Sequence, residues 1–157
     1  MNEQTPKRDP ATSDGISRAD WDQVTDLACT LANLVNPNTS PASAATQRAL
    51  LRLLKRLGKK YGAKASLIAT KADYIGRPRL REKYLLKAHA LTRPDDSQNK
   101  SLIAASLTTF YIKEQPNPAL GLHWLAQLKA DLANYPDDDA QEEMQRLEQA
   151  LSTLIST

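Results

Sequence analysis

Residues 40–62 read SPASAATQRALLRLLKRLGKKYG, and this stretch indicates the fold class most directly. Its large apolar residues recur at intervals of three or four, which is typical of the buried face of an α-helix; they are Leu50, Leu53, Leu54, Leu57 and Tyr61. Ser40 and Pro41 stand at its start, where a serine caps free amide groups and a proline needs no hydrogen-bond donor. The stretch therefore predicts a long amphipathic helix.

The same periodicity recurs along the rest of the chain. Aromatic residues make up 5% of the sequence and there are 5 glycines, a composition that disfavours an all-β fold. Polar breaks divide the chain from Ser17 onward at Asn36-Pro37, Gly62, Gly76-Arg77-Pro78, Arg93-Pro94-Asp95, residues 115–118 and residues 135–137. The segments between them predict an all-α fold of about seven antiparallel helices covering about 70% of the chain.

Several residues predict where these helices begin, end and pack. Ser17 with Asp20 three residues later, and Asn117 before Pro118, are typical of helix starts. Gly76 is a candidate for the left-handed residue that closes a helix. Trp124 and Leu128 share one apolar face and should be buried.

Length and local composition predict the domain organisation. The chain has 157 residues and 41% hydrophobic content, enough for one core. Residues 1–14 are polar, include Pro6 and Pro10, and have no apolar periodicity, so we expect a flexible N-terminal arm. Residues 15–157 are expected to form a single helical domain.

An internal repeat appears in the middle of the chain. Ser66-Leu67-Ile68-Ala69 recurs as Ser101-Leu102-Ile103-Ala104, and Tyr74-Ile75 recurs as Tyr111-Ile112. With Pro94 and Pro136 after the second helix of each unit, residues 63–94 and 98–136 resemble two tetratricopeptide repeats. This resemblance implies stacked antiparallel helical hairpins and a protein-binding scaffold. A plain helical bundle with similar hairpins is the alternative.

Charge is strongly segregated along the sequence although the net charge is only +3. Residues 1–47 carry three basic and six acidic side chains, residues 48–93 fourteen and two, and residues 94–157 four and ten. Within the long helix predicted in residues 40–62, five basic residues lie within about 100° of arc around the helix axis, on the side opposite the leucines. They are the candidate partner-binding residues Arg48, Arg52, Lys55, Arg56 and Lys59.

Two structural explanations compete with partner binding by these five residues. A charged helix face is often simply solvated, and the acidic last helix, with Glu142, Glu143 and Glu148, could compensate the positive charge. Nucleic-acid binding by residues 48–93 is the functional alternative, with tyrosines interleaved among the basic residues. Those tyrosines lie on or beside apolar faces, which favours a core position over base stacking.

No catalytic pattern stands out. His89 and His123 lack a second ligand at metal-binding spacing, so we expect neither a metal nor a cofactor. Cys29 is the single cysteine and is interpreted as a small packing residue. The sequence has no apolar run long enough to span a membrane and no secretory signal, which predicts a cytoplasmic protein without membrane contact.

These observations together favour a non-enzymatic helical-repeat protein that binds an acidic face of a partner protein, as an adaptor, an inhibitor or a toxin-neutralising immunity protein.

Overall fold

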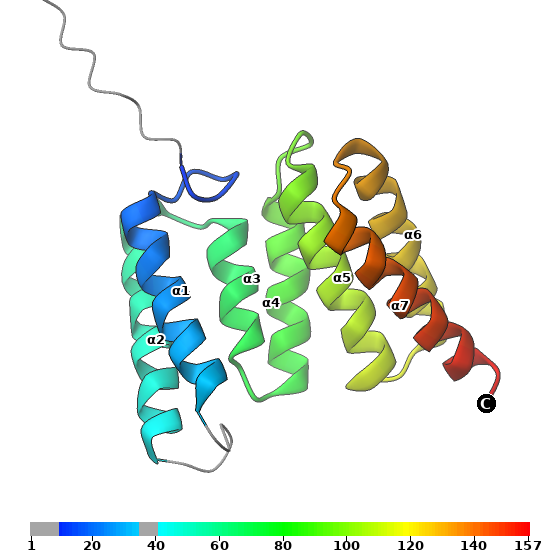
Figure 1. Cartoon of the computed structure of the whole chain (residues 1–157), viewed down its shortest axis with the longest axis horizontal. Helices are drawn as coiled ribbons and strands as arrows, with labels where there is room; N and C mark the ends of the chain where they lie inside the picture. The colour runs from blue at the N-terminus through cyan, green and yellow to red at the C-terminus, as the bar shows by residue number, and fades with distance from the viewer. Residues whose placement is uncertain (1–9, 35–40) are drawn as a thin grey trace, which may run out of the picture. The chain divides into compact units, whose positions relative to one another are not determined.

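The computed structural model describes residues 10–34 and 41–157 (Figure 1). Of these, 79% lie in helices and none lies in a strand. The described chain forms seven helices, α1 (Arg18–Asn33), α2 (Pro41–Tyr61), α3 (Ala65–Asp73), α4 (Pro78–Leu91), α5 (Ser97–Lys113), α6 (Pro118–Asn134) and α7 (Asp138–Ile155). The predicted all-α fold is confirmed.

The chain divides into two compact units, residues 1–67 and residues 68–157, with the boundary inside α3. In the first unit α1 packs along α2. In the second unit α5 contacts α4, α6 and α7, and α6 also contacts α7. One domain over residues 15–157, and a tetratricopeptide-like stacking of hairpins, stay predictions.

Helix starts follow local sequence closely. The hydroxyl of Ser17 accepts a hydrogen bond from the Asp20 amide at 3.2 Å, as the sequence predicts. Asp96, Asn117 and Asp137 cap α5, α6 and α7 in the same way, each through an amide three residues later. The proposed cap Ser40 lies outside the described residues.

The expectation for Gly76 is wrong. Among the described glycines, positive φ occurs at Gly15 and at Gly62, where φ is 81° just after the end of α2. Helix α3 ends at Asp73, so Gly76 lies in the connection to α4, and its φ is not positive.

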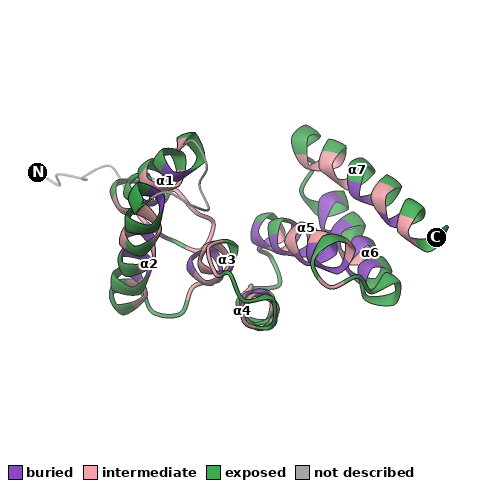
Figure 2. Cartoon of the chain, turned by 90° about the horizontal axis from the view of Figure 1, so that it is seen from below, coloured by how far each residue is buried: buried purple, intermediate pink, exposed green. Residues whose placement is uncertain are grey.

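The core of the second unit is centred on α5 and α6, which carry most of its buried residues (purple in Figure 2). Trp124 is 8% exposed and Leu128 is 1% exposed, so their predicted burial is confirmed. Helical spacing from Tyr84 and Ala88 to Leu91, and from Leu120 to Trp124 and Leu128, also predicts burial of Leu91 and Leu120, but both are exposed, while Leu85 is buried. Both exposed leucines lie at a helix end, where neighbouring helices cover less of the surface.

Residues 11–16 form a turn, in which the Ala11 amide donates to the Ile16 carbonyl at 2.9 Å. The Asp14 carboxylate accepts hydrogen bonds from the amide and hydroxyl of Ser66, at 2.8 and 2.7 Å. The last residues assigned to the arm therefore contact the start of α3. Residues 1–9, the rest of the predicted arm, lie outside the described part.

The repeated tetrads occupy different positions in their helices. Ser66 is the second residue of α3, whereas Ser101 is the fifth residue of α5. As a result Leu67 is buried, while its sequence counterpart Leu102 is 59% exposed. Leu102 therefore adds a large apolar side chain to the surface of the second unit.

Candidate functional site

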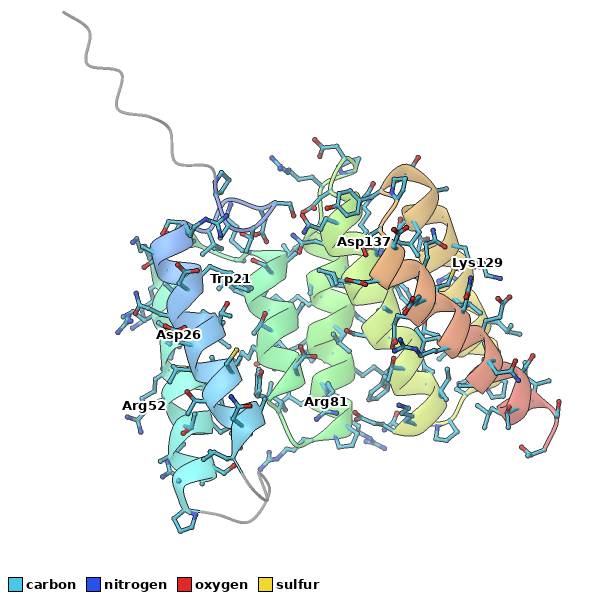
Figure 3. The ribbon with its side chains drawn as sticks, in the orientation of Figure 1. Trp21, Asp26, Arg52, Arg81, Lys129 and Asp137 are labelled. Carbon is cyan, nitrogen blue, oxygen red and sulfur yellow. The ribbon has the colours of Figure 1, made fainter. Side chains whose placement is uncertain are left out.

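The five basic residues singled out by the sequence all lie exposed on α2. We call Arg48, Arg52, Lys55, Arg56 and Lys59 the cationic ridge. The opposite side of α2 buries Leu50, Leu53, Leu54 and Leu57. Figure 3 labels Arg52 on α2 and Asp26 on the adjacent helix α1. The helix therefore presents its charge to solvent while its apolar side is fixed in the core of the first unit.

A polar cluster joins the C-terminal end of α2 to the start of α1. The Asp20 carboxylate accepts hydrogen bonds from the Lys60 ammonium group at 2.7 Å and from the Tyr61 hydroxyl at 2.5 Å. The Tyr61 oxygen in turn accepts from the Ser17 amide at 3.2 Å. The bonds from Lys60 and then Tyr61 lower the pKa of Asp20 to about 2. This cluster holds the two helices in register.

The ridge has no counter-ion within the part of the chain that the structure describes. Arg56 donates to the side-chain oxygen of Gln23 at 3.3 Å, but no ion pair joins any of the five ridge residues to a carboxylate in the described chain. The acidic residues of α7 that were considered as compensating charges pair elsewhere. Glu142 and Glu143 contact Arg146, and Glu148 contacts Lys129.

A surface hollow of about 460 Å³ lies between α1 and α2, beside the ridge. Its lining combines apolar residues with charges of both signs; it consists of Gln23, Asp26 and Leu27 from α1 and Ala49, Arg52, Leu53 and Arg56 from α2. The contribution of α1 was not predicted. A signal for it existed, because Leu27 is a large apolar residue three positions after Val24 and four before Leu31, at the edge of the buried side of α1.

The described residues contain no group of three or more His, Cys, Asp or Glu side chains placed to hold a metal ion. His89 packs edge-on against Trp124, with ring centroids 4.8 Å apart, and burial lowers its pKa. Cys29 is exposed, so its interpretation as a packing residue is wrong. The reason is that the α1–α2 contact covers a narrower side of α1 than the sequence suggested, with Val24 and Leu31 buried.

Within the described chain, none of the helices has both the length and the apolar character needed to cross a membrane. Comparison with models of protein families, with curated proteins and with solved structures gave no match. The described chain combines an all-α fold with a dense cationic ridge on α2.

Proposed function

We propose that this chain is a non-enzymatic protein-binding module whose cationic ridge contacts an acidic surface of a partner protein. The observation that carries the proposal is the exposure of five basic side chains along one helix, none of them in an ion pair with a carboxylate among residues 10–34 and 41–157. Because α2 is fixed from behind by buried leucines, the backbone positions that carry the arginine side chains have a defined spacing. Such spacing suits paired arginine–carboxylate contacts. With such contacts the module would act as an adaptor, an inhibitor or a toxin-neutralising immunity protein.

The neighbourhood of the ridge favours a protein over nucleic acid as the partner. Asp22 and Asp26 are exposed on α1, and Asp26 lines the same hollow as Arg52 and Arg56. Carboxylates at this position repel a phosphate backbone, which presents only negative charge. A protein surface offers carboxylates for the arginines together with apolar and basic groups for the hollow.

The decisive variant reverses two ridge charges, Arg52→Glu with Arg56→Glu. Lys83→Glu with Lys87→Glu is the matched control, because both residues are exposed one helical turn apart on α4 and the change in net charge is the same. As a probe we choose a synthetic amphipathic helical peptide with glutamates along one face and leucines beside them. Fluorescence anisotropy measures its affinity, and stopped-flow measures its association rate.

We expect the ridge variant to lose affinity for the acidic peptide by about tenfold or more, chiefly through slower association. The control should change affinity by less than about threefold. Unchanged peptide affinity in the ridge variant would contradict the proposal. The nucleic-acid alternative would prevail if the wild type bound an oligonucleotide duplex more tightly than the peptide, with a steep salt dependence lost in the ridge variant.

A pull-down with and without nuclease treatment adds a second measurement. Partners that need the ridge should be retained by the control, absent from the ridge variant and insensitive to nuclease.

A further inference from the structure

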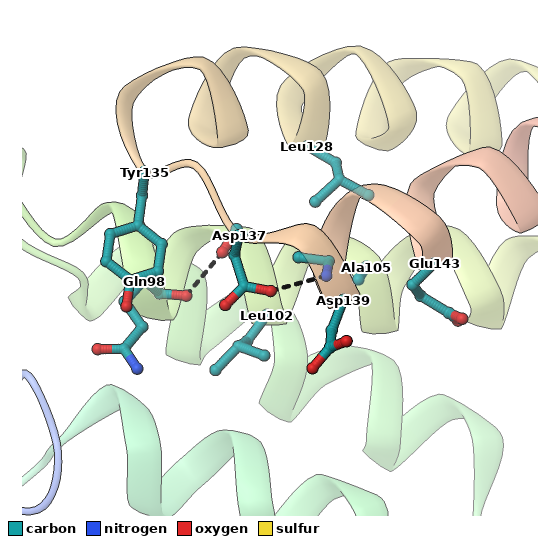
Figure 4. A pocket seen from close by; sticks show the side chains of 10 residues that line it. Gln98, Leu102, Ala105, Leu128, Tyr135, Asp137, Asp139 and Glu143 are labelled. Atoms are coloured by element: carbon teal, nitrogen blue, oxygen red, sulfur yellow. Dashed lines mark hydrogen bonds between the residues drawn. The ribbon is translucent and has the colours of Figure 1, made fainter.

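The second unit contains a surface groove that is apolar and lined by carboxylates, whereas the ridge is positively charged. Two hollows, of about 350 and 300 Å³, adjoin one another along α5. They share Leu102 and Ala105 of α5 and Glu143 of α7, so they form one continuous groove. Leu128 of α6 also lines the larger hollow, which Figure 4 shows from close by.

Large apolar side chains are exposed in this groove. Leu102 lines both hollows and is 59% exposed, and Tyr135, which lines the larger hollow, is 39% exposed. A single exposed leucine is ordinary on a convex surface. In a groove, its neighbours Ala105 and Leu128 allow an entering apolar group to be surrounded on several sides, which favours binding.

The groove is also negatively charged. The larger hollow is lined by three carboxylates, Asp137, Asp139 and Glu143, and by no basic residue. In the smaller hollow the guanidinium group of Arg81 already has partners within the unit. It donates hydrogen bonds to the carbonyl oxygens of Ala72 and Ile75 and forms an ion pair with Glu114. The charge of this arginine is therefore compensated within the unit. Glu143 is itself paired with Arg146, whereas Asp137 and Asp139 form no ion pair with described residues, so the negative charge of the groove rests mainly on these two.

The start of α7 explains part of this charge but not the whole arrangement. Asp137 caps the helix through the Ala140 amide at 2.8 Å, and Asp139 lies in the first turn, where acidic residues are favourable. Glu143 lies beyond the first turn, and helix capping gives no reason for the exposure of Leu102 or Tyr135. An apolar floor beside carboxylates is complementary to a segment with both apolar and basic side chains.

We propose that this groove binds a cationic segment of another protein, in which an apolar side chain contacts Leu102 and flanking lysines or arginines face Asp139 and Glu143. A second copy of this chain is a poorer occupant. Its cationic ridge supplies the charge, but the leucines of the same helix are buried and leave no apolar group for the groove. The proposal is independent of the ridge, so the chain would carry two binding surfaces of opposite charge.

The test uses a labelled peptide with two leucines among lysines and arginines, and a second peptide in which serine replaces both leucines. Asp139→Lys with Glu143→Lys reverses the groove charge. Asp138→Lys with Glu142→Lys is the matched control, because this pair has the same spacing, lies in the same part of α7 and does not line the groove. Both pairs also remove one contact to Arg146, from Glu143 or Glu142.

We expect the groove variant to lose affinity for the leucine peptide by about tenfold or more, and the control by less than about threefold. Leu102→Ser should weaken binding of the leucine peptide and leave the serine peptide unaffected, while Arg52→Glu with Arg56→Glu should leave both unaffected. Circular dichroism verifies that each variant is folded.

Three results would overturn the proposal. If both α7 variants lost the same affinity for the leucine peptide, the peptide would be attracted only by the overall negative charge of this region and not by the groove. Equal affinity of the two peptides for the wild type would remove the role of the apolar floor. Concentration-dependent association in analytical ultracentrifugation, abolished by either the ridge or the groove variant, would identify a second copy as the occupant.

Discussion

Two glycines inside helices should respond to alanine in opposite ways. A Cβ atom at Gly121 of α6 lies 2.9 Å from Cδ1 of Leu151 in α7, whereas a Cβ atom at Gly58 of α2 meets nothing within 4 Å. Carbon atoms prefer about 3.5–4.0 Å, so Gly121→Ala forces the Leu151 methyl group to move by about 0.6 Å or more. Leu151 is buried and has little space to yield.

The expected free energies follow from two opposing effects. Overpacking costs about 1–3 kcal/mol, and replacing a helical glycine by alanine recovers about 0.5–1 kcal/mol. Gly121→Ala should therefore destabilise the second unit by about 1 kcal/mol, while Gly58→Ala should stabilise the first by up to about 1 kcal/mol. Urea titrations followed by far-UV circular dichroism and tryptophan fluorescence measure both effects, since Trp21 and Trp124 lie in different units.

A double-mutant cycle with Leu151→Ala isolates the contact. Removing the leucine side chain leaves room for the new methyl group, so in that background Gly121→Ala should become neutral or stabilising. If Gly121→Ala stabilised the wild type as much as Gly58→Ala does, or if its cost persisted without the leucine side chain, the close approach of α6 and α7 at this point would be refuted.

Three further predictions concern buried and coupled side chains. Trp124→Ala should cost about 3–5 kcal/mol in a urea titration, and a loss below about 1 kcal/mol would contradict its burial. Because the folded pKa of Asp20 is about 2, below its ordinary 3.8, the wild type should lose stability as pH falls from about 4 to 2, and Asp20→Asn should lose less over this range. Burial lowers the pKa of His89 below its ordinary 6.5, so its protonation opposes folding. Wild-type stability should therefore fall below about pH 6.5 in acid titrations followed by circular dichroism, and His89→Leu should reduce this fall.

The sequence predicted the features of this fold that depend on neighbours in the chain. Ser17 and Asn117 cap their helices as expected, because the hydrogen bond of a cap closes within three residues. The burial of Trp124 and the exposure of the cationic ridge also followed from helical periodicity, which fixes the opposite faces of one helix.

Features that depend on the packing of separate helices were missed. Helical periodicity gives the direction of the apolar face but not how much of the helix surface the neighbouring helices bury. The exposure of Cys29, Leu91 and Leu120 was therefore not predicted. The α5–α7 groove was missed for the same reason, since it combines residues from α5, α6 and α7 and from the connection at Tyr135. Its one sequence signal was Leu102, a large apolar residue that does not share the helical spacing of Ile103, Leu107 and Phe110, which are buried in α5.

The segregation of charge in the sequence places unpaired positive charges side by side on the cationic ridge. Ion pairs neutralise Lys60, Arg81, Lys129 and Arg146, whereas the five ridge cations pair with no carboxylate of the described residues. Unpaired like charges on one helix repel one another, and this repulsion opposes folding unless mobile ions or a partner compensate it. Folding alone therefore gives no reason for the ridge. A partner that supplies the missing charge gains affinity from each contact and relieves the repulsion among the ridge cations, which is why we propose a binding role for the ridge.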